Sequence, residues 1–132
     1  MNIMRKYIVL LSLIIVASCG KKDVYSEEVV GNAAKQYYSY LLEGNYEAFV
    51  DGCYQKDTIR KEYRDQLVDN AKMFVGQQKM EHKGIKIYDV TSVKVDTVSH
   101  TANVFMKLSF GDNTTAQVVL PMVEKDELWY MR

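Results

Sequence analysis

The chain has 132 residues, of which 48% are hydrophobic and 26% charged, with 17 basic and 17 acidic side chains. This length suffices for one domain with its own hydrophobic core. The balanced charge excludes the strongly basic surface that nucleic-acid binding requires, so no nucleic acid is expected as a partner.

The N-terminal segment has the layout of a secretory signal. Arg5 and Lys6 are basic, and the run at 7–16 is almost wholly apolar but too short to span a bilayer as a mature anchor. The sequence Val-Ala-Ser-Cys at 16–19 follows and resembles the bacterial lipobox, in which the cysteine receives diacylglycerol. The alternative is an ordinary small-residue cleavage site that abuts a cysteine.

The lipobox resemblance implies that residues 1–18 are a signal peptide, that Cys19 is acylated and palmitoylated, and that 19–24 is a lipidated tether. The domain would then occupy 25–132. Several acyl chains on Cys19 would anchor the protein stably to a membrane without spanning it.

Gly20 stands where an Asp would retain a lipoprotein in the inner membrane of double-membraned bacteria. The expected location is therefore the cell envelope, at the outer membrane, on its periplasmic or its surface side. The charged residues at 21–23 are either a solvated linker or resemble a surface-export signal. With Cys19 acylated, Cys53 has no partner for an intramolecular disulfide and is expected to be a small buried apolar group.

Two amphipathic helices are expected in the first half of the domain. The first follows Ser26, a good N-cap, runs over 29–42 and ends at Gly44. A short helical turn follows Asn45. The next long helix is expected to begin near Asp57 or Thr58, to carry its apolar stripe over 59–74 and to weaken at Gly76.

Alternating residues predict an antiparallel sheet after residue 85. The clearest strand is 101–110, in which Met106 and Leu108 belong to the apolar face and are expected to point at the helices. Short polar turns at 111–113 and 124–127 separate it from strands at 116–122 and 128–132, which must therefore be antiparallel neighbours. The first strand, 85–98, alternates less regularly.

Helices followed by strands predict an α+β domain, with N-terminal helices packed on a curved four-stranded antiparallel sheet. The Leu-Glu-Gly-Asn-Tyr-Glu-Ala-Phe segment at 42–49, the second and third helices and the closing strand with Trp129 together resemble the cystatin-like cone of the nuclear transport factor two superfamily. More narrowly, the chain is similar to small bacterial lipoproteins of undefined function. The similarity covers 25–132 and concerns the fold, not a chemistry.

Enzymes of that superfamily place Asp, Tyr or His in a pocket between the helices and the sheet, which makes Asp89 the candidate acid. In a regular strand Asp89 would point into the cone, where burial would raise its pKa as a general base requires. A β-bulge near it would instead turn Tyr88 and Val90 inward and leave the acid outside.

Four tyrosines are candidate ligand-binding residues because each ring offers apolar area and one hydroxyl: Tyr37, Tyr38, Tyr54 and Tyr63. They could equally be core rings whose hydroxyls reach the surface. His82 and His100 are expected to face solvent. No motif with metal-ligand spacing and no phosphate-binding glycine loop is present, so no metal and no cofactor are expected.

Three functions follow as hypotheses. The favoured one is a non-catalytic, membrane-anchored lipoprotein that binds a small apolar molecule or an envelope protein. The second is an enzyme of the isomerase or dehydratase type that uses Asp89 and a tyrosine such as Tyr38 or Tyr54. The third is a structural accessory domain of an envelope complex. The oligomeric state does not follow from the sequence.

Overall fold

The computed structural model describes residues 23–132, and the expectations for Cys19, the signal peptide and most of the tether lie outside these residues. Helices α2 (Glu27–Glu43), α3 (Tyr46–Asp51) and α4 (Lys61–His82) precede strands β1 (Ile85–Asp96), β2 (Thr101–Phe110), β3 (Thr115–Lys125) and β4 (Leu128–Met131). The strands form one antiparallel sheet in the order β1-β2-β3-β4. The predicted α+β architecture is confirmed.

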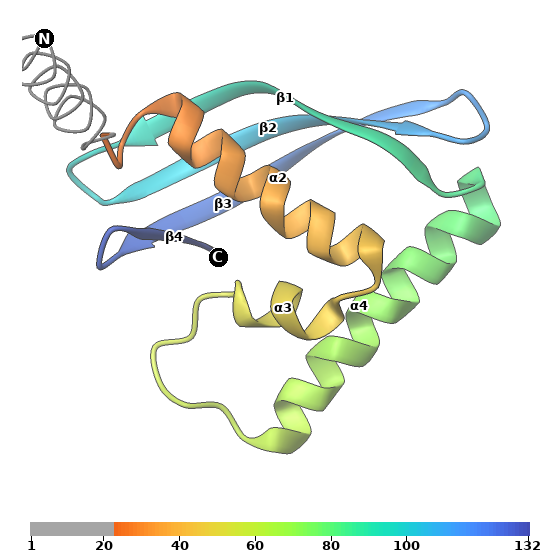
Figure 1. Cartoon of the computed structure of the whole chain (residues 1–132), viewed down its shortest axis with the longest axis horizontal. Coiled ribbons are helices and arrows are strands. Elements are labelled where there is room, and N and C mark those ends of the chain that lie inside the picture. Colours follow the sequence, from red (N-terminus) through yellow and green to blue (C-terminus); the bar gives the residue numbers. More distant parts are fainter. Residues whose placement is uncertain (1–22) are drawn as a thin grey trace, which may run out of the picture.

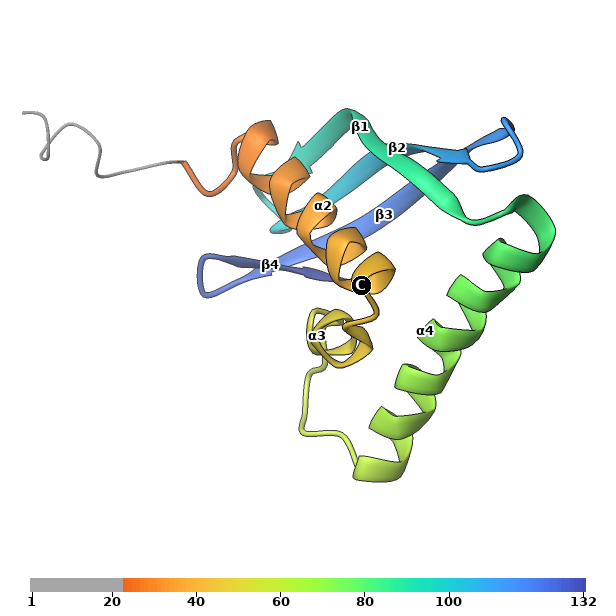
Figure 2. The ribbon, with the colours of Figure 1, turned by 45° about the vertical axis from the view of Figure 1, so that its right-hand side comes forward.

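The three helices lie on the same side of the sheet (Figure 1). Helix α2 crosses the sheet, α3 lies beneath its C-terminal end, and α4 runs obliquely past α3 toward the start of β1 (Figure 2). Among residues 23–132, no helix is both long enough and apolar enough to cross a membrane.

Helix α2 has the boundaries that its sequence predicts. The Ser26 side chain accepts a hydrogen bond from the Val29 amide, which satisfies one free donor of the first turn. Gly44 ends the helix in the left-handed conformation, at a φ of 84°, and its amide and that of Asn45 bond to carbonyls of the last turn. The buried face of α2 consists of Val30, Gly31, Ala34, Tyr38 and Leu41.

Helix α4 is shifted toward the C-terminus relative to its prediction. It begins at Lys61, after Arg60, whose side chain makes no capping bond, and it ends at His82 instead of near Phe74. The expected start at Asp57 or Thr58 is wrong, because both residues lie in the loop between α3 and α4. A glycine in a helix interior costs only about 1 kcal/mol, so Gly76 does not stop a helix that continues with good helix formers.

Strand β2 has the predicted register. Met106 is fully buried and Leu108 is 2% exposed, and both belong to the core cluster that includes Val30 and Ala34 of α2. Their neighbour Lys107 is exposed. The alternation therefore assigned the correct face of this strand to the helices.

Strand β1 contains two irregularities in its pairing with β2, one between Ile85 and Ile87 and one between Val90 and Ser92. At the second, Thr91 is the extra residue, and its hydroxyl donates to the Phe105 carbonyl at 3.1 Å. The bulge shifts the alternation by one residue. Val90 before it and Val93 after it consequently both pack against the core.

Strand β4 and the end of α3 close one side of the sheet. Cys53 forms an isolated parallel bridge with Met131, supported by backbone bonds from the Tyr54 amide to Met131 and from the Met131 amide to Gly52. Gly52 is required here because a Cβ on it would lie 2.2 Å from Cε1 of the Tyr37 ring.

Candidate functional site

An apolar cavity of about 320 Å³ lies between the three helices and strand β3. Helix α2 contributes Tyr38 and Leu41, and β3 contributes Leu120. The rest of the lining comes from α3 with the residues after it and from α4: Phe49, Val50, Cys53, Leu67, Asn70, Ala71 and Phe74. A concave, mostly apolar cavity with a few polar groups is the usual form of a small-molecule site.

The cavity has few polar groups, namely those of Tyr38, Asn70 and Cys53. Its lining contains no Asp, Glu, His, Lys or Arg. Burial raises the pKa of the Tyr38 hydroxyl, which therefore stays protonated at neutral pH. The Asn70 side-chain carbonyl accepts a hydrogen bond from the Gln66 side-chain amide at 3.0 Å, and its NH₂ group is a further hydrogen-bond donor of the lining.

Cys53 is the free cysteine of the described residues, and it is half-buried in the cavity wall. Its thiol donates to the Phe49 carbonyl at 3.8 Å. Burial, followed by the nearby charge of Asp51, raises the pKa of this thiol. Cys53 is therefore a neutral apolar wall residue and not an activated nucleophile.

Of the four candidate tyrosines, only Tyr38 lines this cavity, and its ring stacks on Tyr88 of β1 at 6.0 Å between centroids. The Tyr37 hydroxyl donates to the Trp129 carbonyl and so links α2 to β4. Tyr54 lies in a neighbouring loop cleft, and Tyr63 is 51% exposed on α4. The predicted tyrosine wall is thus reduced to one ring.

Asp89 lies outside the cavity. It is exposed and lies opposite Lys107 in the register of β1 and β2. Its neighbours Tyr88 and Val90 pack against the core. This is the arrangement of the bulged alternative. The structure therefore does not bring Asp89 together with the polar groups that line the cavity.

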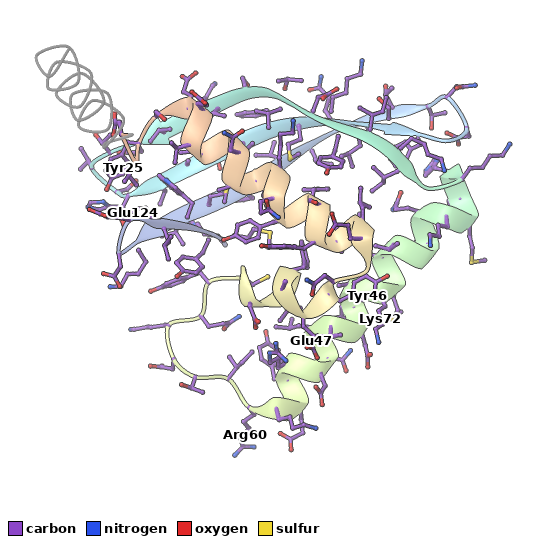
Figure 3. The ribbon with its side chains drawn as sticks, viewed as in Figure 1. Tyr25, Tyr46, Glu47, Arg60, Lys72 and Glu124 are labelled. Atoms are coloured by element: carbon purple, nitrogen blue, oxygen red, sulfur yellow. The ribbon has the colours of Figure 1, made fainter. Side chains whose placement is uncertain are left out.

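A second hollow, of about 390 Å³, opens beside the loop between α3 and α4. Charged side chains line it, including Lys56, Asp57 and Lys125. Arg64 on its wall is paired with Asp51 at 2.9 Å and reaches Glu47 at 3.9 Å. These ion pairs, with Lys72 of α4 lying 6.0 Å from the centre of the Tyr46 ring (Figure 3), hold α3 against α4 at the surface.

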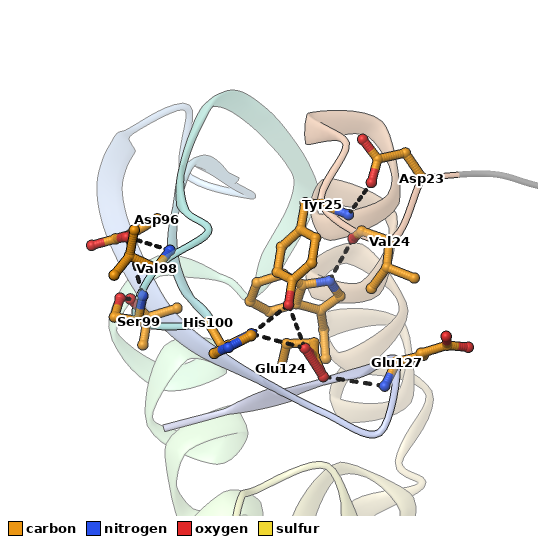
Figure 4. A network of polar contacts seen from close by, with 11 residues as sticks. Asp23, Val24, Tyr25, Asp96, Val98, Ser99, His100, Glu124 and Glu127 are labelled. Carbon is orange, nitrogen blue, oxygen red and sulfur yellow. Dashed lines mark hydrogen bonds and ion pairs between the residues drawn. The ribbon is translucent and has the colours of Figure 1, made fainter.

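A polar cluster that the sequence did not predict joins the start of the domain to two hairpin turns. The Tyr25 hydroxyl donates to Glu124 at 2.6 Å and contacts Nδ1 of His100, which is itself 3.2 Å from Glu124 (Figure 4). The hydrogen bond to Glu124 is the main reason why the Tyr25 pKa rises to about 12, and it lowers the Glu124 pKa. The hydroxyl therefore stays protonated and links the start of the domain to Glu124 and His100.

This cluster continues into the core through Trp129. The indole Nε1 donates to the Val24 carbonyl at 2.8 Å, and the Tyr25 ring packs edge-on against the indole at 5.9 Å between centroids. The chain at 24–25 is therefore attached directly to β4. No local pattern indicates such contacts, because the partners are about a hundred residues apart.

His82 lies at the opposite end of the sheet, beside the turn between β2 and β3. Its Nδ1 lies 3.0 Å from the Asp112 carboxylate, and its ring stacks on Phe110 at 4.7 Å. Hydrogen bonds from Thr114, more than the contact with His82, lower the Asp112 pKa to about 2. The expectation of solvent exposure holds for His100, which is exposed although it contacts Glu124. It is incomplete for His82, which is only partly exposed and contacts Asp112. Within residues 23–132, no group of three His, Cys, Asp or Glu side chains could hold a metal ion.

Comparison with known proteins supports the fold. No family model matches the sequence, and no curated protein matches it. A crystal structure from Campylobacter jejuni, which carries the name of an NTF2-like transpeptidase, superposes with a TM-score of 0.62 at 13% identity, over 76% of this chain and 94% of that one. Identity this low shows the fold alone. The chain therefore has the NTF2-like, cystatin-like α+β fold, with helices over a four-stranded antiparallel sheet.

Proposed function

We propose that this protein is a lipid-anchored lipoprotein of the cell envelope whose domain binds a small apolar molecule without catalysing a reaction. The observation that carries the proposal is the cavity between the helices and β3, which has an apolar lining and no Asp, Glu, His, Lys or Arg. General acid–base catalysis most often uses one of these groups, or a Tyr or Cys whose pKa is shifted toward neutral. Burial instead raises the pKa of both Tyr38 and Cys53, the Tyr and Cys of the lining.

The name of the fold neighbour does not favour transpeptidation here. Acyl transfer of that kind uses an activated Ser or Cys next to a base. Cys53 is the cysteine of this cavity, and its thiol has a raised pKa and a backbone carbonyl as its hydrogen-bond partner. These properties are the opposite of those of a nucleophilic thiolate.

Ligand binding is tested with the neutral fluorescent probe N-phenyl-1-naphthylamine. Leu120→Trp should fill the cavity from β3. The indole would then occupy the space that the probe needs, so probe binding should weaken by at least about ten-fold. Val119→Trp is the matched control, because Val119 is the next residue of the same strand and is 51% exposed. The proposal fails if the parent protein does not bind the probe, or if Leu120→Trp binds it as tightly as Val119→Trp.

The anchor is tested separately. Cys19 follows an apolar run and two small residues, which motivates its assignment as the acylated residue. Cells grown with an alkyne analogue of palmitate should label the parent protein, and Cys19→Ser should abolish the label and release the protein from the membrane fraction. Cys53→Ser is the control and should keep the label. Labelling that persists in Cys19→Ser contradicts the proposal.

A further inference from the structure

Strand β3 is only partly covered on its outer edge. Its pairing with β4 runs from Met122 to Lys125, and the Arg132 amide adds one bond to the Pro121 carbonyl. The segment 115–120 pairs with β2 on one side and with no strand of the described chain on the other. Figure 1 shows β4 reaching along only one end of β3.

The register identifies the backbone groups on this free edge. The Phe110 amide bonds to the Thr114 carbonyl, so every second pair from there, such as Met106 with Val118, exchanges the ladder bonds. The residues between them turn their amide and carbonyl groups outward: Thr115, Gln117 and Val119. Pro121 follows the same alternation, which explains why a residue without an N–H is tolerated there.

The exposed edge lacks the usual protection against strand addition. Edge strands are commonly guarded by Lys or other charged side chains, by bulges or by a covering segment. The residues at 114–122, Thr-Thr-Ala-Gln-Val-Val-Leu-Pro-Met, include no charged side chain. Only Pro121, at the covered end, is a residue of the protective kind.

An apolar groove runs beside this edge, beneath α4. Its volume is about 290 Å³, and its floor is formed by β2 and β3, with Ala116 and Val118 next to the edge. The α4 wall supplies Phe74, Gln78 and His82. Phe74 also lines the cavity described above, so the two hollows are neighbours along α4.

We propose that the β3 edge at 115–120 and the adjoining groove form a docking site for an extended, uncharged peptide segment of a partner protein. The segment adds a strand to the sheet by bonding to the outward groups of Thr115, Gln117 and Val119. Its alternate side chains, which face the helices, are apolar and fill the groove. Six residues of strand span about 20 Å, so a segment of six or seven residues matches the edge.

A second copy of this chain fits the edge less well. The inward side chains of a second β3, among them Ala116 and Val118, already line the groove of their own chain. They therefore cannot fill the groove of the partner, which a separate peptide can.

The site is tested with heptapeptides selected on the purified full-length protein from a random phage-displayed library. The selected peptides should alternate apolar with other residues and carry no charge on the apolar face. On binding, the Gln117 and Val119 amides should become protected from hydrogen exchange, whereas the Val118 amide, already bonded to β2, should change little. Val119→Pro removes one outward amide and should weaken binding about ten-fold, and Val119→Thr keeps that amide and should bind within about two-fold of the parent.

Three results would overturn the inference: no enrichment of peptides, equal binding by Val119→Pro and Val119→Thr, or a homodimer that depends on the edge and that selected peptides do not disrupt. If Val119→Pro does not fold, the peptide is changed instead, and N-methylation of the residues whose amides face β3 should abolish binding while N-methylation of the alternate residues should not. The naphthylamine probe should bind Val119→Pro normally, because Val119 does not line the cavity. Loss of peptide binding is thus separable from failure of the proposed apolar-ligand function.

Discussion

Replacing Met106 with alanine is expected to lower the free energy of unfolding by about 2 to 5 kcal/mol. Met106 is fully buried in the middle of β2, between the sheet and the helices, so truncation removes buried apolar surface and leaves a cavity that the packed neighbours cannot fill. Urea unfolding followed by circular dichroism measures the change.

The control for this substitution is the next residue of the same strand. Lys107 is exposed and faces the opposite side of the sheet, so Lys107→Ala should change stability by no more than about 0.5 kcal/mol. Equal losses in the two variants would mean that the strand register is wrong, since a slip of one residue exchanges the two faces.

Replacing Trp129 with alanine is expected to cost about 3 to 5 kcal/mol, the range for large aromatic residues in a core. Trp129 is 4% exposed and belongs to the core cluster. Its indole also holds the Val24 carbonyl and supports the Tyr25 ring, so the substitution should release the start of the domain from the sheet as well. Thermal unfolding and hydrogen exchange near residue 25 measure the two effects.

Two further variants separate packing from anchoring at this position. Trp129→Phe keeps most of the ring volume but removes the donor to Val24, and should lose about 1 kcal/mol for the hydrogen bond together with the protection near residue 25. Leu128→Ala is the exposed control, since Leu128 is 59% exposed, and should behave like the parent protein. Full stability in Trp129→Ala would contradict its place in the core.

The Tyr25 cluster determines where the described part of the domain begins. The cluster joins the chain at 24–25 to the turns at His100 and Glu124, at the end of the sheet away from α4. The first described residues therefore lie at the end of the sheet opposite the groove beneath α4.

Local interactions explain what the sequence alone determined. The start and end of α2 follow from the Ser26 cap and from Gly44, and both act within a few residues of themselves. The register of β2 follows from strict alternation over ten residues, which is decisive when one face is buried. The short turns after β2 and β3 then fixed the antiparallel order of the last three strands.

Non-local contacts explain what only the tertiary structure decided. The orientation of Asp89 depends on the bulge at Thr91, which lets Val90 and Val93 both pack on the core although their spacing breaks the alternation. Local propensity did not place the start of α4, which the sequence pattern put near Asp57 or Thr58 and which the structure puts at Lys61. The cavity and the Tyr25 cluster form where segments far apart in the chain come into contact. The free edge of β3 exists because β4 pairs with only one end of that strand. Residue spacing along the sequence does not predict these long-range arrangements.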